Sequence, residues 1–133
     1  MILWRVSNYQ TLDGVGGLYV SGRWHSKGQP VIYCTLNPAT ALLETLVHIE
    51  IDSEDRPERF QVLRIEGPDT LSIEVIEANT LPSNWAEDIA STQNVGDRWL
   101  SERRSLLLKV PSVLVPETWN VLVNPHNTPK RTC

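Results

Sequence analysis

Short apolar segments with alternating polar positions run through most of the chain, separated by Gly, Pro, Asn and Asp. This spacing is typical of half-buried strands that are joined by turns. Residues 18–24, which follow the glycine-rich turn "DGVGGL", are predicted to form a short, irregular strand. The better-defined predicted strands cover residues 2–7, 30–35, 58–67, 70–77, 106–110, 112–115 and 120–124.

Residues 37–49, "NPATALLETLVHI", form the clearest predicted helix. Asn37 is a favourable N-cap, and Pro38 occupies the first helical position, where its missing N–H costs nothing. Glu44 lies beside the apolar positions and is therefore expected near the edge of the core. The apolar positions recur every three or four residues and are expected to face the core; they are Leu42, Leu43, Leu46, Val47 and Ile49.

Two further helices are predicted, a short one over residues 83–88 and a longer one over residues 92–105. No repeat, low-complexity tract or linker divides the chain. Residues 1–133 are therefore expected to form one domain. The order of strands and helices predicts an α+β fold, with a mixed, largely antiparallel sheet flanked by helices.

Composition narrows the possible functions. Hydrophobic residues make up 41% and charged residues 21% of the 133 positions, as in an ordinary folded protein. The formal net charge of −4 leaves no basic surplus, so direct binding to nucleic acid or to a membrane is not expected. The N-terminus lacks the pattern of a secretory signal, and no apolar run has the length of a membrane span. We expect a cytoplasmic protein.

The cysteines and histidines lack the spacing of a metal site, and no metal is expected. Cys34 lies within a predicted strand and Cys133 is the last residue, so Cys34 is predicted to be a buried thiol outside any disulfide. The histidines, which together with Glu44 would have to supply the ligands, show no His-Glu-x-x-His pattern; they are His25, His48 and His126.

Two arginines stand in apolar, aromatic surroundings, Arg5 in "LWRVS" and Arg23 in "SGRWH". A buried guanidinium is costly unless it is paired, so both are expected to have anionic partners. Either each forms a structural salt bridge, for instance with Glu44, or the two converge on a phosphorylated ligand. Tyr33 is similarly open to two interpretations, a core aromatic or a platform facing a cleft.

The motifs "LWRVS", "SGRWHSKGQPVIYCT", "ATALLETLVH", "LLLKVPSVLVP" and "NVLVNP", in this order, resemble the RES domain, a family named for an arginine, a glutamate and a serine. The resemblance spans nearly the whole chain and implies a fold similar to that of ADP-ribosyltransferases. It further implies the toxin of a bacterial toxin–antitoxin pair, which consumes NAD⁺ and is restrained by a Xre-like antitoxin. A homodimer is expected within that complex, and Trp85 and Trp119 are candidate interface anchors, although either can be a core residue.

By its motifs, the resemblance assigns Arg23 and Glu44 as catalytic and adds Arg5, Tyr33 and Ser112 to the NAD⁺ pocket. Glu44 would stabilise an oxocarbenium-like transition state while nicotinamide leaves. The acceptor of the ADP-ribosyl group stays open: water gives hydrolysis, phosphate gives phosphorolysis, and a protein side chain gives mono-ADP-ribosylation. The alternative from another class is a catalytically weak scaffold that mainly binds the antitoxin.

The chain departs from the family pattern at two places. His25 follows the Gly-Arg-Trp triplet where many relatives have asparagine, and we assign it no role. Relatives usually continue from an "NPxHP"-like stretch into a further strand, whereas this chain reads "NPHNTPKRTC". The C-terminal end of the domain is therefore expected to be shortened relative to the family.

Overall fold

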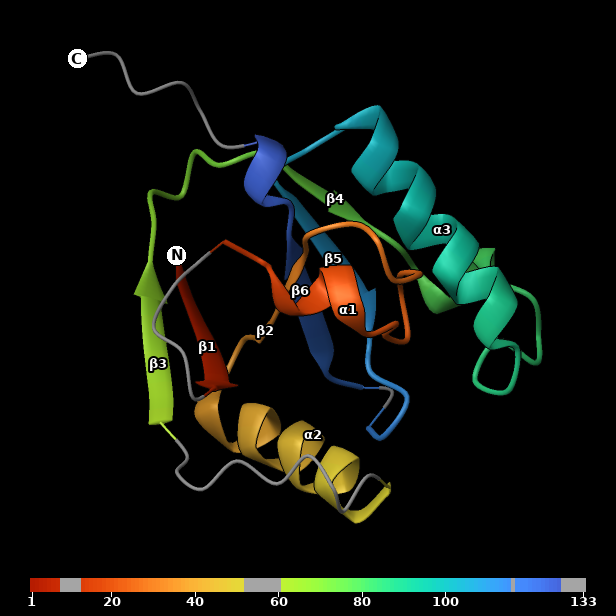
Figure 1. Ribbon diagram of the computed structural model, residues 1–133, viewed down its shortest axis with the longest axis horizontal. Coiled ribbons are helices and arrows are strands. Elements are labelled where there is room, and N and C mark those ends of the chain that lie inside the picture. The colour runs from red at the N-terminus through yellow and green to blue at the C-terminus, as the bar shows by residue number, and fades with distance from the viewer. Residues whose placement is uncertain (8–12, 52–60, 116, 128–133) are drawn as a thin grey trace.

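The computed structural model describes residues 1–7, 13–51, 61–115 and 117–127. They form one six-stranded sheet in the order β3-β1-β2-β6-β5-β4, with helices around it (Figure 1). The strands are β1 (Ile2–Ser7), β2 (Ile32–Thr35), β3 (Gln61–Glu66), β4 (Ile73–Val75), β5 (Leu107–Pro111) and β6 (Trp119–Val123). The helices are α1 (Gly16–Tyr19), α2 (Pro38–Ile51) and α3 (Ile89–Glu102), with short 3₁₀ turns η2 (Ala78–Thr80) and η3 (Pro125–Asn127).

The sheet is mixed and largely antiparallel, as the sequence predicts. Each pair of neighbouring strands is antiparallel except β4 and β5, which run parallel. Strands β3 and β4, predicted at residues 58–67 and 70–77, follow each other in the sequence but lie at opposite edges of the sheet (Figure 1). The α+β class is confirmed. No helix in the described ranges is long and apolar enough to cross a membrane.

Two apolar clusters pack on the sheet, and consecutive residues of β5 contribute to different ones because side chains alternate along a strand. Leu108 joins the cluster that contains Trp99 and Leu100 of α3. Leu107 joins a second cluster with Leu3 of β1 and residues of β2 and β6. The described residues thus supply enough core for a single domain, and α3 covers one part of it.

The two tryptophans considered as interface anchors both pack on their own chain. The ring centroids of Trp85 and Trp24 are 6.2 Å apart, and Trp85 packs against the α3 cluster. Lys109 Nζ lies 4.6 Å from the centroid of the Trp119 ring, a cation–π contact across β5 and β6. Both side chains are half-buried, and of the two only Trp85 packs against a core cluster, so their role as interface anchors stays a prediction.

Helix α2 begins as predicted but presents its apolar residues differently. Asn37 caps it, since its Oδ1 accepts a hydrogen bond from the Thr40 N–H at 2.7 Å. The helix packs against β1 and β2, and Ala41 is buried there. The prediction that the leucines face the core is wrong for the three that are exposed by 41–46%, Leu42, Leu43 and Leu46. The side chains of Val47 and Ile49 lie outside the described residues. The helix meets the sheet through a narrow face, so the wide apolar stripe exceeds what the sheet can cover.

The predicted strand over residues 18–24 is also wrong. Gly14 adopts φ 71°, a left-handed conformation that favours glycine, and its carbonyl accepts the Gly17 N–H at 3.0 Å. The chain turns there into the short helix α1, and a single bridge between Gly22 and His25 replaces the strand. The backbone groups are therefore satisfied within a compact loop instead of a ladder.

Two other predicted elements are absent from the described residues. Residues 83–88, predicted as a short helix, form hydrogen-bonded turns that lead to the Asp88 cap of α3. Residues 112–115, predicted as a strand, form a bend. The Ser112 hydroxyl oxygen accepts the N–H groups of Leu114 and Val115, which removes both donors from any ladder.

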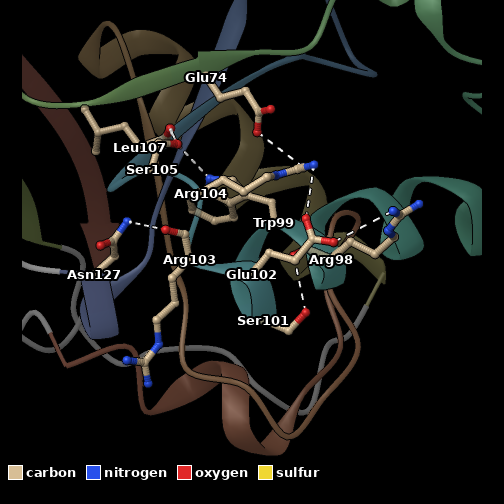
Figure 2. A network of polar contacts seen from close by, with 10 residues as sticks. All are labelled: Glu74, Arg98, Trp99, Ser101, Glu102, Arg103, Arg104, Ser105, Leu107 and Asn127. Carbon is tan, nitrogen blue, oxygen red and sulfur yellow. Dashed lines mark hydrogen bonds and ion pairs between the residues drawn. The ribbon is translucent and has the colours of Figure 1, made fainter.

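A surface network ties the end of α3 to β4 and β5 (Figure 2). Arg104 forms ion pairs with Glu74 and Glu102, each at 3.3 Å. Beneath them, Trp99 Nε1 donates to Ser105 Oγ at 2.8 Å. The charged side chains are at least one-third exposed, so each ion pair adds little stability. The network connects secondary-structure elements and contains none of the candidate site residues.

Gly96 lets α3 lie directly on the loop that carries Arg23. A Cβ atom at Gly96 would overlap the carbonyl oxygen of Trp24, a backbone atom that cannot rotate away. Side chains of the same helix form four hydrogen bonds with this loop. Thr92 Oγ1 donates to the Arg23 carbonyl at 2.6 Å and Gln93 Nε2 to the Gly22 carbonyl at 3.0 Å, while Asp97 accepts from Ser26 N at 2.8 Å and from Ser26 Oγ at 2.7 Å. The close contact between α3 and the loop therefore explains why position 96 is a glycine.

We predict that Gly96→Ala lowers the free energy of unfolding by about 1–3 kcal/mol or more, because the added methyl group forces α3 away from the loop. In an unconstrained helix the same change is stabilising by about 0.5–1 kcal/mol. Gly16→Ala is the matched control, since no atom lies within 4 Å of a Cβ placed there. Urea unfolding measures both variants. Equal stability of the two would contradict the close approach.

Candidate active site

Three polar side chains from distant parts of the sequence meet at one end of β5 and β6. Glu44 projects from α2, and its Oε1 accepts hydrogen bonds from Ser112 Oγ at 2.9 Å and from Asn120 Nδ2 at 3.1 Å. Ser112 directly follows β5, and Asn120 lies on β6. In the register of the sheet Asn120 pairs with Thr35 on one side and Val110 on the other. The pairing of β5 with β6 therefore delivers both donors to the same carboxylate.

The hydroxyl of Ser112 has a single possible orientation. Its oxygen accepts the N–H groups of Leu114 at 3.2 Å and Val115 at 3.3 Å, so its one proton is directed to Glu44. The residue is fully buried. Ser112 therefore orients the carboxylate and has no proton left for a second acceptor.

The other carboxylate oxygen of Glu44 is differently placed. Within the described residues Oε2 has no hydrogen-bond partner, and the Glu44 side chain is half-buried. A carboxylate with one oxygen held by two donors and the other unoccupied is fixed in direction and retains acceptor capacity. It can bind hydroxyl groups or lie against a developing positive charge.

Asn120 is a site residue that the sequence-based reasoning missed. It stands in the strand "WNVLV", where the next three residues are apolar. Its Oδ1 is buried and has no hydrogen-bond partner in the described part of the chain. A lone amide in an apolar strand is the signal that indicates it, although the sequence does not show what it would contact.

The two arginines have no carboxylate partner among the described residues. Arg5 Nη1 is buried and finds no hydrogen-bond partner in residues 1–7, 13–51, 61–115 and 117–127. Its charge acts on the neighbouring strand, where burial raises the pKa of Cys34 to about 12 and Arg5 partly opposes that rise. Cys34 is a free, buried thiol as predicted, and Cys133 lies outside the described residues. The expected salt bridge between Arg5 and Glu44 is not formed.

Arg23 is held by backbone. Its Nη1 donates to the Ala86 carbonyl at 2.8 Å, and its own carbonyl accepts the Thr92 hydroxyl at 2.6 Å. A carbonyl oxygen leaves the positive charge uncompensated, so in the described part of the chain Arg23 also lacks an ion pair. The structural salt bridge proposed as one interpretation of Arg23 is therefore absent within those residues.

Tyr33 takes part in a series of hydrogen bonds with Trp24, His25 and Gly17. Its hydroxyl oxygen accepts the Trp24 N–H at 3.1 Å and lies 2.7 Å from His25 Nδ1, while His25 Nε2 lies 3.2 Å from the Gly17 carbonyl. The Gly17 carbonyl can only accept, so His25 Nε2 is the donor to it, and Nδ1 shares a hydrogen bond with the Tyr33 hydroxyl. Burial raises the pKa of Tyr33 well above its usual value. His25, left without a role by the sequence, joins α1 to β2.

The structure therefore brings some of the predicted site residues together and not others. Glu44 and Ser112 are in direct contact, and α2 packs against β1, the strand of Arg5. Tyr33 reaches the backbone next to Arg23 through Trp24. Among the described residues no hydrogen bond or ion pair links Arg5, Arg23 or Tyr33 to Glu44.

The histidines considered as metal ligands lie apart from one another in the described residues. Within the described ranges no three of the His, Cys, Asp and Glu side chains form a group that could hold an ion. Both ring nitrogens of His25 are occupied by protein groups. His126 is exposed on η3, and the side chain of His48 lies outside the described residues.

Comparison with known proteins shows to which family the chain belongs. A model of the RES domain matches residues 2–132, and the chain belongs to the RES domain family. A protein of Pseudomonas putida called Toxin Res is 49% identical over 127 residues, which cover 96% of this chain and 86% of that protein. The Prs ADP-ribosylating toxin of a Sphingobium species is 37% identical over 118 residues, covering 86% of this chain and 72% of that protein.

A solved structure supports the fold. The MbcT-MbcA toxin-antitoxin complex of M. tuberculosis contains a chain that matches with a TM-score of 0.77 and 16% identity. The match covers 98% of this chain and 77% of that one. At this identity the likeness extends to the fold alone.

We predict that Tyr33→Phe lowers the free energy of unfolding by about 1–3 kcal/mol, because the Trp24 N–H and His25 Nδ1 both lose their buried partner. Tyr19→Phe is the control, since Tyr19 is 74% exposed. Its free energy of unfolding is expected to change by less than about 0.5 kcal/mol. Chemical unfolding of both variants measures the difference. A Tyr33→Phe variant as stable as the control would show that the chain of hydrogen bonds does not form.

Proposed function

We propose that this chain is the toxin of a toxin–antitoxin pair and that it cleaves the bond between nicotinamide and ribose in NAD⁺. The observation that carries the proposal is the Glu44 carboxylate, which has two donors on Oε1 and, among the residues that the structure describes, none on Oε2. Membership of the RES domain family and the name of the Sphingobium relative, an ADP-ribosylating toxin, support the same chemistry.

In this reaction the C–N bond breaks and its electron pair passes to the pyridinium nitrogen, so nicotinamide leaves as a neutral molecule and needs no proton. Positive charge develops on the ribose. Glu44 Oε2 would bind the ribose hydroxyls and stabilise that charge more in the transition state than in the ground state. A water, phosphate or protein nucleophile then completes the transfer and loses its proton to solvent.

The uncompensated arginines would supply the binding energy. Two guanidiniums without carboxylate partners in the described residues suit a pyrophosphate, which accepts paired N–H donors. Arg5 would use its unpartnered Nη1, and Arg23 would use the donors that Ala86 leaves free. Tyr33, whose hydroxyl is engaged, would contribute its ring face to the nicotinamide or ribose. Ser112 would act through Glu44.

We expect the wild-type chain to convert NAD⁺ into nicotinamide and an ADP-ribosyl product, and Glu44→Gln to lower kcat by about 10²–10³-fold. Glutamine keeps an oxygen for Ser112 and Asn120 but lacks the charge, so folding and NAD⁺ affinity should change little. Mass spectrometry of reactions with and without phosphate identifies the acceptor, and thermal melts report folding.

Unchanged NAD⁺ with the folded wild-type chain would overturn the proposed activity. A folded Glu44→Gln variant that binds NAD⁺ and turns it over at the wild-type rate would remove Glu44 from the mechanism. In the first case the scaffold alternative, in which antitoxin binding is the main property, becomes the better account.

The exposed leucines of α2 favour a protein partner beside the proposed site. Leu42 and Leu43 precede Glu44 on the same helix, and Leu46, one turn after both, continues the exposed apolar surface. Apolar side chains at the centre of an interface are typical of protein association. We propose that a Xre-like antitoxin covers this surface, and that the resulting cytoplasmic complex contains a toxin homodimer.

The test is co-expression with the small DNA-binding protein that we expect to be encoded beside this chain; if none is encoded there, the proposed partner is wrong. The wild-type chain is expected to co-purify with it, and Leu42→Glu combined with Leu46→Glu should reduce the complex by about tenfold or more, since charges oppose burial. Val62→Glu on β3, also exposed, is the control and should leave the complex intact. Loss of the complex with the control alone would place the partner elsewhere.

A further inference from the structure

We propose that Asn120 is a positioning residue, which orients the Glu44 carboxylate at the expense of its own hydrogen bonding. The inference rests on the function proposed above and assigns a further residue to that site. Asn120 is argued to act through Glu44, without touching the substrate itself.

The amide of Asn120 makes one side-chain hydrogen bond within the described residues. Nδ2 donates to Glu44 Oε1 at 3.1 Å, and Oδ1 is buried with no donor in reach. Turning the amide over would place Oδ1 against Glu44 Oε1, two acceptors with no proton between them. Glu44 therefore fixes the direction of the amide, and the buried Oδ1 stays unsatisfied as a result.

The Asn120 side chain as a whole is half-buried, but its Oδ1 atom is fully enclosed. Val110, which pairs with Asn120 across β5, and Leu122, two residues along β6, are both fully buried. An unsatisfied buried acceptor is destabilising, whereas an apolar residue of similar shape avoids that cost. A buried polar atom left without a hydrogen bond, with no compensating gain in stability, is typical of functional positions.

Ser112 cannot be interpreted in the same way, because its hydroxyl also accepts two backbone N–H groups. Replacing Ser112 would disturb the bend after β5 as well as Glu44. Asn120 lacks that second task. Its replacement isolates the orientation of the carboxylate from the integrity of the fold.

Asn124, directly after β6, offers a matched control. It is fully buried like the core residues, and both ends of its amide are satisfied: Nδ2 donates to the Leu100 carbonyl at 3.2 Å, and Oδ1 accepts the His126 N–H at 3.0 Å. No hydrogen bond connects it to Glu44 in the described part of the chain. The same Asn→Leu change at the two positions thus removes a positioning amide in one and a structural amide in the other.

The experiment measures melting temperature, kcat and KM for Asn120→Leu and Asn124→Leu. We expect Asn120→Leu to melt at or above the wild-type temperature. Its kcat should fall about 10- to 100-fold while KM changes less than about threefold, because only the orientation of the Glu44 carboxylate is lost. Asn124→Leu should melt at a lower temperature and keep the wild-type kcat in its folded fraction. Opposite effects on stability and turnover are the signature of a positioning role.

A double-mutant cycle provides the second arm. Because Asn120 is argued to act through the charge of Glu44, Asn120→Leu should cause little further loss of kcat in a Glu44→Gln background. An additive loss would overturn the proposal, as would a wild-type kcat in Asn120→Leu. A lowered melting temperature that accounts for all lost turnover would assign Asn120 a structural role instead.

A readout without turnover separates this inference from the proposed function. In ¹⁵N NMR spectra the side-chain amide of Asn120 should shift clearly on Glu44→Gln, whereas that of Asn124 should not. If the wild-type chain leaves NAD⁺ intact, the proposed activity fails, and the amide shift together with the melting temperatures still decides whether Asn120 is held by Glu44. An unmoved Asn120 amide would overturn the pairing.

Discussion

The hydrogen bond from Ser112 to Glu44 is the contact that organises this molecule. It joins α2 to the end of β5 across 68 positions of sequence, and the same hydroxyl ends the strand by taking up two backbone donors. One buried oxygen atom therefore determines where β5 stops and in which direction the carboxylate points. The site follows from the termination of a strand, which explains why it lies at an end of the sheet.

A second group of contacts holds the Arg23 loop independently of the first. Tyr33 and His25 tie the loop to β2 and α1, and side chains of α3 hold its carbonyl groups. The two groups approach the sheet from different elements and share no hydrogen bond among the described residues. A change that disturbs one of these groups therefore leaves the hydrogen bonds of the other in place.

Local chemistry made much of the fold predictable from sequence. Alternating apolar residues located β1, β2 and β6, and the Asn-Pro cap located the first residue of α2, because these signals depend only on neighbouring residues. The strand expected at residues 112–115 failed because a side chain captured its donors. The leucines of α2 were misplaced because periodicity shows that a helix has an apolar face, and not how much of it the sheet covers.

The candidate site was predictable only in part for a similar reason. Glu44 and Ser112 were named from the family resemblance, and the structure places them in contact; their catalytic assignment, with those of Arg5, Arg23 and Tyr33, stays a prediction. Asn120 escaped notice because a single polar residue in a strand does not reveal its partner across the sheet. The network of His25 depends on contacts between α1, β2 and the intervening loop, which no local pattern encodes.

The close contact of α3 with the Arg23 loop at Gly96 has a thermodynamic consequence. Since helix backbone lies on loop backbone there, and Thr92, Gln93 and Asp97 hold the same loop, the loop has little freedom apart from the helix. The backbone that carries the Arg23 side chain has therefore already lost most of its conformational entropy during folding. An anion that meets Arg23 therefore encounters a preorganised donor, and more of the interaction energy is retained as affinity.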